Sequence, residues 1–190
     1  MKSKSKKVVF FRTDAQINQG LGHIMRCYSL ASELKSQNIK CIFIIRKESL
    51  DNFKKINSLN FNYYSISVIK KNRKTIVDSK LTFNLVKKNN VRLIIKDTYE
   101  LDKNWFKIFK ENKIPTMEID DFKFRRILSN YLINHCYGAD KKYKFMSINN
   151  KFSLLGSEYA ILNKKIFQND KNINSTKNIK QILIYFGGND

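Results

Sequence analysis

Short apolar runs that alternate with helical patterns constrain the fold of this chain more than any other feature. Four of these runs are rich in apolar residues and lie at 7–11, 40–46, 91–95 and 115–119. Between the first two, at 23–37, apolar residues recur at the i, i+3, i+4, i+7 spacing of a helix face. Buried strands separated by helices of about 10 to 15 residues are typical of βαβ units. We therefore predict an α/β fold with a Rossmann-like open parallel sheet and helices on both faces. The other predicted elements are helices at 50–59, 75–89 and 102–111 and strands at 62–69 and 130–133.

The first strand runs into a glycine turn and a histidine, in the segment FRTDAQINQGLGHIMRC at 11–27. Gly20 and Gly22 allow a tight turn and a close approach to a ligand, because they have no Cβ. His23 then falls in the first turn of the predicted helix, where the partial positive charge of the helix start disfavours the imidazolium. A neutral histidine can accept a proton, so His23 is a candidate general base.

Other polar residues follow further strands of the predicted sheet. Asp97 and Tyr99 come after the strand at 91–95, and Asp120 and Asp121 come after the strand at 115–119. In an open parallel sheet, ligands bind beyond the carboxyl ends of the strands. We expect these groups to meet His23 at one edge, as a hydrolytic site requires.

Each of these residues also has a purely structural interpretation. His23 is then a capping or core histidine, and Asp97 and the aspartate pair cap helices or form turns. Tyr99 alone would serve packing. His135 ends a strand-like run beside Cys136, and we interpret it as structural.

The strong positive charge has two interpretations. The formal net charge is +21, from 37 basic and 16 acidic residues. Clustered Lys and Arg would indicate a nucleic-acid partner. However, only seven of the basic residues are Arg, the residue that reads bases and phosphates in a bidentate manner. We expect a solvated Lys-rich surface and no nucleic-acid partner.

Cysteine usage and hydropathy indicate the compartment. Cys27, Cys41 and Cys136 are odd in number and far apart, which favours reduced thiols and disfavours a metal site. No run approaches the roughly 20 apolar residues of a membrane span. The basic start of the chain lacks the apolar region of a signal peptide. We expect a cytoplasmic protein without a membrane span.

The pattern changes near Lys164. Residues 164–181 are polar and rich in Asn and Lys, whereas 182–186 form a new apolar strand followed by Gly187 and Gly188. We predict a Rossmann-like catalytic domain at 1–163, a linker at 164–181, and at 182–190 the first strand and Gly-Gly loop of a truncated second domain.

Five motifs, in order, resemble the PseG family of UDP-sugar hydrolases. The segment at 11–34 resembles its strand, R-(S/T)-D and G-x-G-H-(I/V)-x-R opening, and IIKDTY at 94–99 resembles its D-x-Y element. EIDD at 118–121 resembles its I-D-D element. LLGSEYAILNKKIF at 154–167 and ILIYFGGND at 182–190 resemble two further elements of the family. The resemblance covers essentially the whole chain, but only the N-terminal half and linker of a PseG.

This resemblance implies a fold and an activity. The fold would be the N-terminal domain of a two-domain GT-B protein of the MurG type. The activity would be hydrolysis of UDP-2,4-diacetamido-2,4,6-trideoxy-β-L-altropyranose in pseudaminic acid biosynthesis. Water would attack the anomeric carbon and release UDP and 2,4-diacetamido-2,4,6-trideoxy-L-altrose, with no cofactor and no metal. His23 would be the base and Tyr99 would position water or sugar. The implied substrate-binding residues are Arg12, Asp14, Gly20, Gly22, Asp97, Gly187 and Gly188.

The chain also departs from the family pattern. Lys96 stands where the family has an apolar strand residue, and we expect it to fray the end of that strand. The resemblance implies a nucleotide-binding domain beyond Asp190, which we expect to be supplied in cis or in trans, and we expect the chain alone to hydrolyse UDP-sugars very poorly. Two alternatives stay open: a GT-B glycosyltransferase, and a non-catalytic remnant or binding module.

Overall fold

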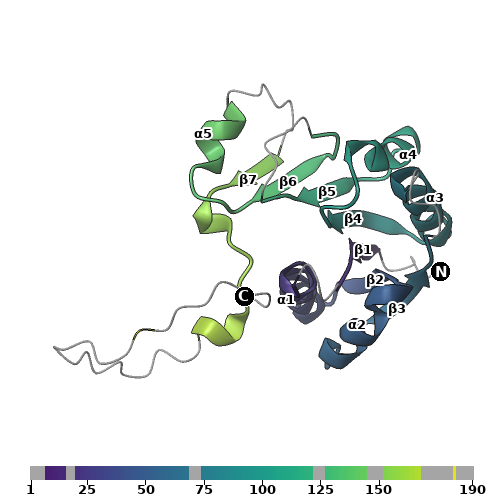
Figure 1. The fold of residues 1–190 in the computed structure, drawn as a ribbon, viewed down its shortest axis with the longest axis horizontal. Coiled ribbons are helices and arrows are strands. Elements are labelled where there is room, and N and C mark those ends of the chain that lie inside the picture. The colour runs from purple at the N-terminus through teal and green to yellow at the C-terminus, as the bar shows by residue number, and fades with distance from the viewer. Residues whose placement is uncertain are drawn as a thin grey trace, which may run out of the picture.

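A single parallel sheet organises the described part of the chain. The computed structural model describes residues 7–15, 20–68, 74–121, 127–144, 152–167 and 182. Within these residues, seven strands form one sheet in which every neighbouring pair is parallel (Figure 1). The strands are β1 (Val8–Thr13), β2 (Lys40–Arg46), β3 (Asn62–Ile66), β4 (Val91–Asp97), β5 (Thr116–Ile119), β6 (Tyr131–Asn134) and β7 (Phe152–Leu155).

The strand order is β3-β2-β1-β4-β5-β6-β7. The chain therefore moves outward from β1 to β3 and then returns to the other side of β1 with β4. The order reverses between β1 and β4, and a reversal of this kind opens a crevice at the carboxyl ends of the two strands. In the register of this pair, Thr13 lies opposite Asp97.

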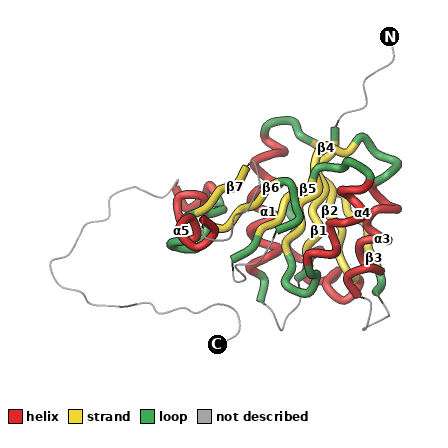
Figure 2. The backbone as a smooth tube through the Cα atoms, turned by 90° about the horizontal axis from the view of Figure 1, so that it is seen from above, coloured by secondary structure: helices red, strands yellow, loops and turns green. Residues whose placement is uncertain are grey.

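Helices cover both faces of the sheet, as predicted (Figure 2). On one face, α1 and α2 pack in a core with Phe11, Phe43 and Phe53. On the other face, α3 and α4 pack around Phe10 and Trp105. Phe10 and Phe11 thus belong to opposite cores, which explains why the central strands are almost continuously apolar. The helices are α1 (Gly22–Ser36), α2 (Leu50–Ile56), α3 (Lys74–Val86), α4 (Lys107–Glu111) and α5 (Ala139–Lys144), with 3-10 turns at Lys47–Ser49, Lys103–Phe106, Ser157–Tyr159 and Lys164–Phe167.

Apart from the strand predicted at 182–186, which lies almost wholly outside the described residues, the predicted strands and helices are confirmed within a few residues, and two elements were not predicted. These are α5 and β7. In β7, Phe152 and Leu154 are exposed, because this strand lies at the edge of the sheet. A four-residue strand of this kind lacks the apolar run that distinguishes β1 or β2 in the sequence.

The expectation that Lys96 frays the end of β4 is wrong. The strand continues through Lys96 to Asp97, and Lys96 is paired in register with Arg12 and Glu118 on its two neighbours. The Lys96 side chain is 1% exposed, with its Nζ 2.7 Å from Glu118 Oε1 and 3.0 Å from the Leu101 carbonyl oxygen, to which it donates. A buried cation is tolerated in a strand when a carboxylate neutralises it.

Most of the predicted linker and second domain lie outside the described residues. Only 164–167 of the linker and Ile182 of the following segment are described. Among the described helices, none has the length and apolarity that crossing a bilayer requires.

Candidate active site

The start of α1 places His23 at the carboxyl edge of the sheet. Gly20 has φ +72°, in the region that favours glycine, and α1 begins two residues later at Gly22. His23 is therefore in the first turn, as the sequence predicts, and its side chain is buried with 8% exposure. Apolar contacts of Ile24, Cys27 and Ala31 with the sheet hold the helix in this position.

His23 forms a buried pair with Asp97, the last residue of β4. Nδ1 of His23 lies 2.6 Å from Oδ1 of Asp97, which is fully buried. Because Asp97 is an acceptor, it favours the tautomer in which Nδ1 carries the proton. Nε2 then has a free lone pair and can accept a proton, so the pair has the chemistry of a general base with an orienting carboxylate.

Arg26 completes this pair and joins it to a third strand. Its Nε donates to Asp97 Oδ2 at 2.6 Å, and its Nη1 donates to Asp121, which follows β5. Burial opposes the charge of Arg26, but the hydrogen bonds and charges of Asp97 and Asp121 outweigh burial and raise its pKa above the ordinary value. Sequence reasoning did not select Arg26, although it stands three residues after His23, on the same side of the helix.

The Asp97 carboxylate is held ionised. Burial by itself would raise the pKa of Asp97, but the hydrogen bonds from Arg26 and His23 outweigh burial and lower it. The thiol of Cys27 also points to Asp97 Oδ2, at 3.4 Å. Burial and the charge of Asp97 raise the pKa of that thiol, so Cys27 stays protonated and is no nucleophile. A role as a helix cap or turn residue does not account for these side-chain contacts of Asp97.

Tyr99 lies against His23 and donates to Asp121. Its ring meets the imidazole edge-on, with ring centroids 4.3 Å apart and an angle of 80° between the planes. The phenol oxygen donates to Asp121 Oδ1. Burial and the neighbouring Asp121 raise the pKa of Tyr99, so the phenol remains a donor at neutral pH.

Arg12 and Asp14 lie in a separate, buried ionic cluster. Arg12 is fully buried, donates to Asp78 Oδ2 at 2.7 Å, and lies 2.9 Å from Asp14 Oδ1. Asp14 Oδ1 also accepts from the backbone N–H of Arg46 at 3.0 Å, and Trp105 Nε1 donates to Asp78 at 2.8 Å. These contacts join the carboxyl ends of β1 and β2 to α3. Neither Arg12 nor Asp14 has a described contact with His23.

The predicted glycines of the substrate pocket fall into two groups. A Cβ at Gly20 or Gly22 would meet no atom within 4 Å, so space lies in front of both residues. Gly187 and Gly188 lie outside the described residues. In the described part of the chain, no group of three metal-ligating side chains is close enough to hold an ion.

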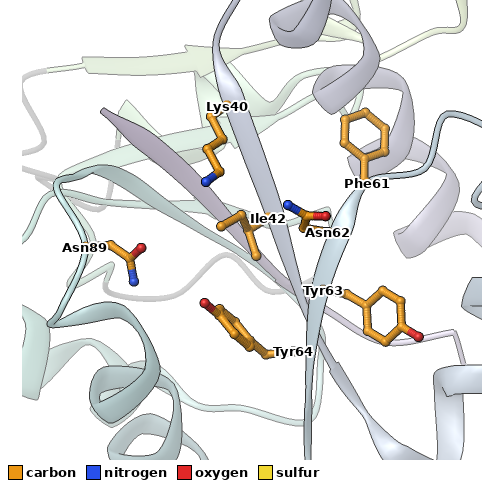
Figure 3. Close-up of a pocket in the computed structure, with 7 residues that line it drawn as sticks. All are labelled: Lys40, Ile42, Phe61, Asn62, Tyr63, Tyr64 and Asn89. Carbon is orange, nitrogen blue, oxygen red and sulfur yellow. The ribbon is translucent and has the colours of Figure 1, made fainter. Parts of the chain in front are cut away.

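A surface cavity lies at the opposite edge of the sheet. It has a volume of about 420 Å³ and is lined by residues of β2, β3 and the segment before β4 (Figure 3). Lys40 and Asn62 are the first residues of their strands, so this cavity is at the amino ends. It is remote from the His23–Asp97 pair, which lies at the carboxyl ends.

Comparisons with known proteins add a fold relationship. No protein-family model matches the chain. The chain is 28% identical over 188 residues to the uncharacterized protein MJ1062 of Methanocaldococcus jannaschii, covering 94% of this chain but 36% of that protein. It is similar to the crystal structure of Acinetobacter baumannii MurG with a TM-score of 0.52 and 12% identity, over 68% of this chain and 41% of MurG. The chain thus spans less than half the length of either protein. Its described part is an α/β Rossmann-like domain with the GT-B-like fold that it shares with MurG.

Proposed function

We propose that this chain carries the base-bearing domain of a UDP-sugar hydrolase of the PseG type. The substrate is UDP-2,4-diacetamido-2,4,6-trideoxy-β-L-altropyranose, and the products are UDP and the free sugar. The observation that carries the proposal is the buried contact of 2.6 Å between His23 Nδ1 and Asp97 Oδ1. The motifs that resemble the PseG family and the GT-B-like fold support it.

In this mechanism, His23 activates a water molecule. Nε2 takes a proton from the water while the water oxygen forms a bond to the anomeric carbon. The bond between that carbon and the phosphate oxygen breaks, and its electron pair leaves with UDP. Asp97 stabilises the imidazolium, which then releases its proton to solvent. A positioned general base of this kind contributes roughly 10²- to 10⁴-fold to the rate.

Tyr99 and Arg26 have supporting parts. Tyr99 limits the movement of the imidazole and, as a protonated phenol, positions water or sugar by hydrogen bonding. Arg26 balances the charge of Asp97, so that the buried carboxylate stays ionised without a bound proton. Their arrangement before substrate binds lowers the reorganisation that the transition state requires.

The remaining predicted residues have different roles in this proposal. The open space in front of Gly20 and Gly22 suits a close approach of the sugar to the backbone. Arg12 and Asp14 hold the carboxyl ends of β1 and β2 from within the domain, and so shape the site without direct contact. We assign the contacts to uridine and diphosphate to a further domain that includes Gly187 and Gly188. This chain by itself would then orient the substrate poorly and turn it over very slowly.

A glycosyltransferase is the second candidate, because the fold is shared with MurG. The same His23–Asp97 pair would then deprotonate a hydroxyl group of an acceptor in place of water. The two candidates differ only in the nucleophile, so product analysis distinguishes them.

The test uses the complete gene product that contains this chain, in water enriched in ¹⁸O. We expect the label in the free sugar and none in UDP, because the bond to the anomeric carbon is the one that breaks. His23→Ala should lose most turnover while UDP still binds, and Ser36→Ala, at the exposed end of α1, should match the parent protein. Label in UDP, or normal turnover by His23→Ala, would overturn the proposal. A sugar conjugate formed only when an acceptor is added would favour the transferase.

A further inference from the structure

A second histidine, His135, lies at the same edge of the sheet as His23. It directly follows β6, whose neighbour β5 leads into Asp121. The strand order therefore places four ends in a row: β1 with His23 of the following helix, β4 with Asp97 and Tyr99, β5 with Asp121, and β6 with His135 (Figure 1). With neighbouring strands about 4.8 Å apart, the row from β1 to β6 extends over roughly 14 Å.

Local hydrogen bonds join the turn that carries His135 to the segment of Asp121. The Cys136 backbone N–H donates to Asn134 Oδ1 at 3.0 Å, which closes the turn around His135. The Cys136 thiol donates to the carbonyl oxygen of Asp121 at 2.8 Å. The backbone N–H of Asp120 donates to the Ile133 carbonyl oxygen at 3.0 Å. His135 is thereby held next to the residues that contact Arg26.

The His135 imidazole has no hydrogen bond to any residue that the structure describes. Its Nδ1 is buried without a partner there, and the ring is only half-buried. Burial lowers the pKa of His135, and the positive charge of Arg26 lowers it further, against the smaller opposite effect of Asp121 and Asp97. A histidine with a purely structural role is expected to have its buried nitrogen paired. Among the described residues, His135 is instead a neutral group without a hydrogen-bond partner, and it lies beside the charges of the site.

We propose that His135 contacts the sugar of the bound UDP-sugar and contributes to the selection of that sugar. This inference rests on the proposed function. A neutral imidazole offers one donor and one acceptor, which suits the hydroxyl and acylamino groups of an amino sugar. His23 approaches from the β1 end of the row and His135 from the β6 end, so that the sugar lies over Asp121 and Tyr99. His135 takes no proton from the nucleophile in this arrangement.

The test is NMR of the complete gene product that contains this chain, labelled with ¹⁵N in histidine. The signals of His135 and His23 are assigned by their loss in the His135→Gln and His23→Ala variants. The probes are UDP and UDP-2,4-diacetamido-2,4,6-trideoxy-β-L-altropyranose, and binding is measured in parallel by calorimetry. We expect the UDP-sugar to shift the signals of both histidines, and UDP alone to leave those of His135 unchanged. His135→Gln should weaken binding of the UDP-sugar about two- to tenfold, as for one lost hydrogen bond, without weakening binding of UDP. Lys141→Gln, on the exposed side of α5, is the control and should change neither affinity.

The outcomes separate this inference from the function on which it rests. A UDP-sugar that shifts His23 but not His135 would overturn the role of His135 and leave the proposed function intact. Equal weakening of UDP and UDP-sugar binding by His135→Gln would also overturn it, because a contact to the sugar affects only the second ligand. If the UDP-sugar shifts neither histidine, the proposed function and this inference both fail.

Discussion

Nδ1 of His23 lies 2.6 Å from Oδ1 of Asp97, although the two residues are 74 positions apart in the sequence. The contact follows from the parallel register of β1 and β4, in which Thr13 is opposite Asp97, and from the glycine turn that starts α1. Arg26, one helical turn after His23, donates to the same carboxylate. Two groups of the candidate site, His23 and Arg26, therefore depend on a single buried aspartate.

Replacing that aspartate should reduce both activity and stability. Asp97→Asn leaves the positive charge of Arg26 without its buried partner and no longer favours the proton on Nδ1 of His23. We expect a loss of about 10²- to 10⁴-fold in kcat and a loss of about 3–5 kcal/mol in the free energy of unfolding. Steady-state kinetics and urea denaturation measure the two effects. Asp140→Asn, on the exposed side of α5, should change neither, and an active, stable Asp97→Asn protein would exclude the pair from catalysis.

Arg26 should tolerate replacement by lysine poorly. The guanidinium contacts Asp97 and Asp121 at once, whereas an ammonium group is a point charge without this planar fork. We expect Arg26→Lys to lower kcat and Arg26→Ala to lower the melting temperature further, because Asp97 is then left uncompensated. Arg92→Lys, at an exposed position of β4, is the matched control. If Arg26→Lys has the same kcat as Arg92→Lys, the two contacts of the Arg26 guanidinium do not contribute to activity.

Acid should destabilise the protein partly through Glu100. Burial opposes the ionised form, but hydrogen bonds from Lys74 and Arg46 outweigh burial and lower the pKa of Glu100 to about 2. A pKa that is lower in the folded state stabilises the protein above the unfolded value of about 4.3, and this contribution disappears as the pH falls toward 2. Melting temperatures between pH 6 and pH 2 should therefore decline less steeply in Glu100→Gln. Parallel curves for the two proteins would show that Glu100 is not a source of the acid sensitivity.

The buried pair of Lys96 and Glu118 should show strong coupling. Lys96→Met removes the cation that neutralises the buried Glu118 carboxylate, and Glu118→Leu removes the anion that neutralises the buried Lys96 ammonium group, so each single variant should lose about 3–5 kcal/mol. The double variant should recover most of this loss, because a buried ion pair replaced by apolar residues is often close to neutral. Urea denaturation of all four proteins measures the coupling energy, with Lys110→Met on exposed α4 surface as the control. Additive losses would mean that the two charges do not depend on each other.

Alanine at Gly22 should affect ligand binding more than stability. A Cβ there meets no protein atom within 4 Å, and Gly22 does not have positive φ. We expect Gly22→Ala to melt within a few degrees of the parent protein and to weaken UDP-sugar binding, because the added methyl group fills space assigned to the sugar. Gly20→Ala, at φ +72°, should instead lose about 1 kcal/mol of stability through backbone strain. Unchanged affinity in Gly22→Ala would place the sugar elsewhere.

Much of the fold could be predicted because its signals are local. Strands such as β1 and β2 are buried on both faces through most of their length, and their central residues are therefore apolar. The face of α1 that meets the sheet has helical spacing in the sequence. The short strand β7 has no such signal, because one side of its backbone has no neighbouring strand among the described residues and its side chains are half exposed.

The sequence by itself determined that His23 would start a helix after a glycine turn, and that Asp97 and Asp121 would lie at the carboxyl ends of strands. Only the tertiary structure decided which side chains meet. Arg26 became part of the site through Asp97 and Asp121, Arg12 was enclosed by Asp78, and Lys96 was neutralised by Glu118. The physical reason is that propensity and periodicity act over one or two turns of chain, whereas a buried charge requires a partner of opposite sign. The order and register of the strands alone determine which residue is close enough to be that partner.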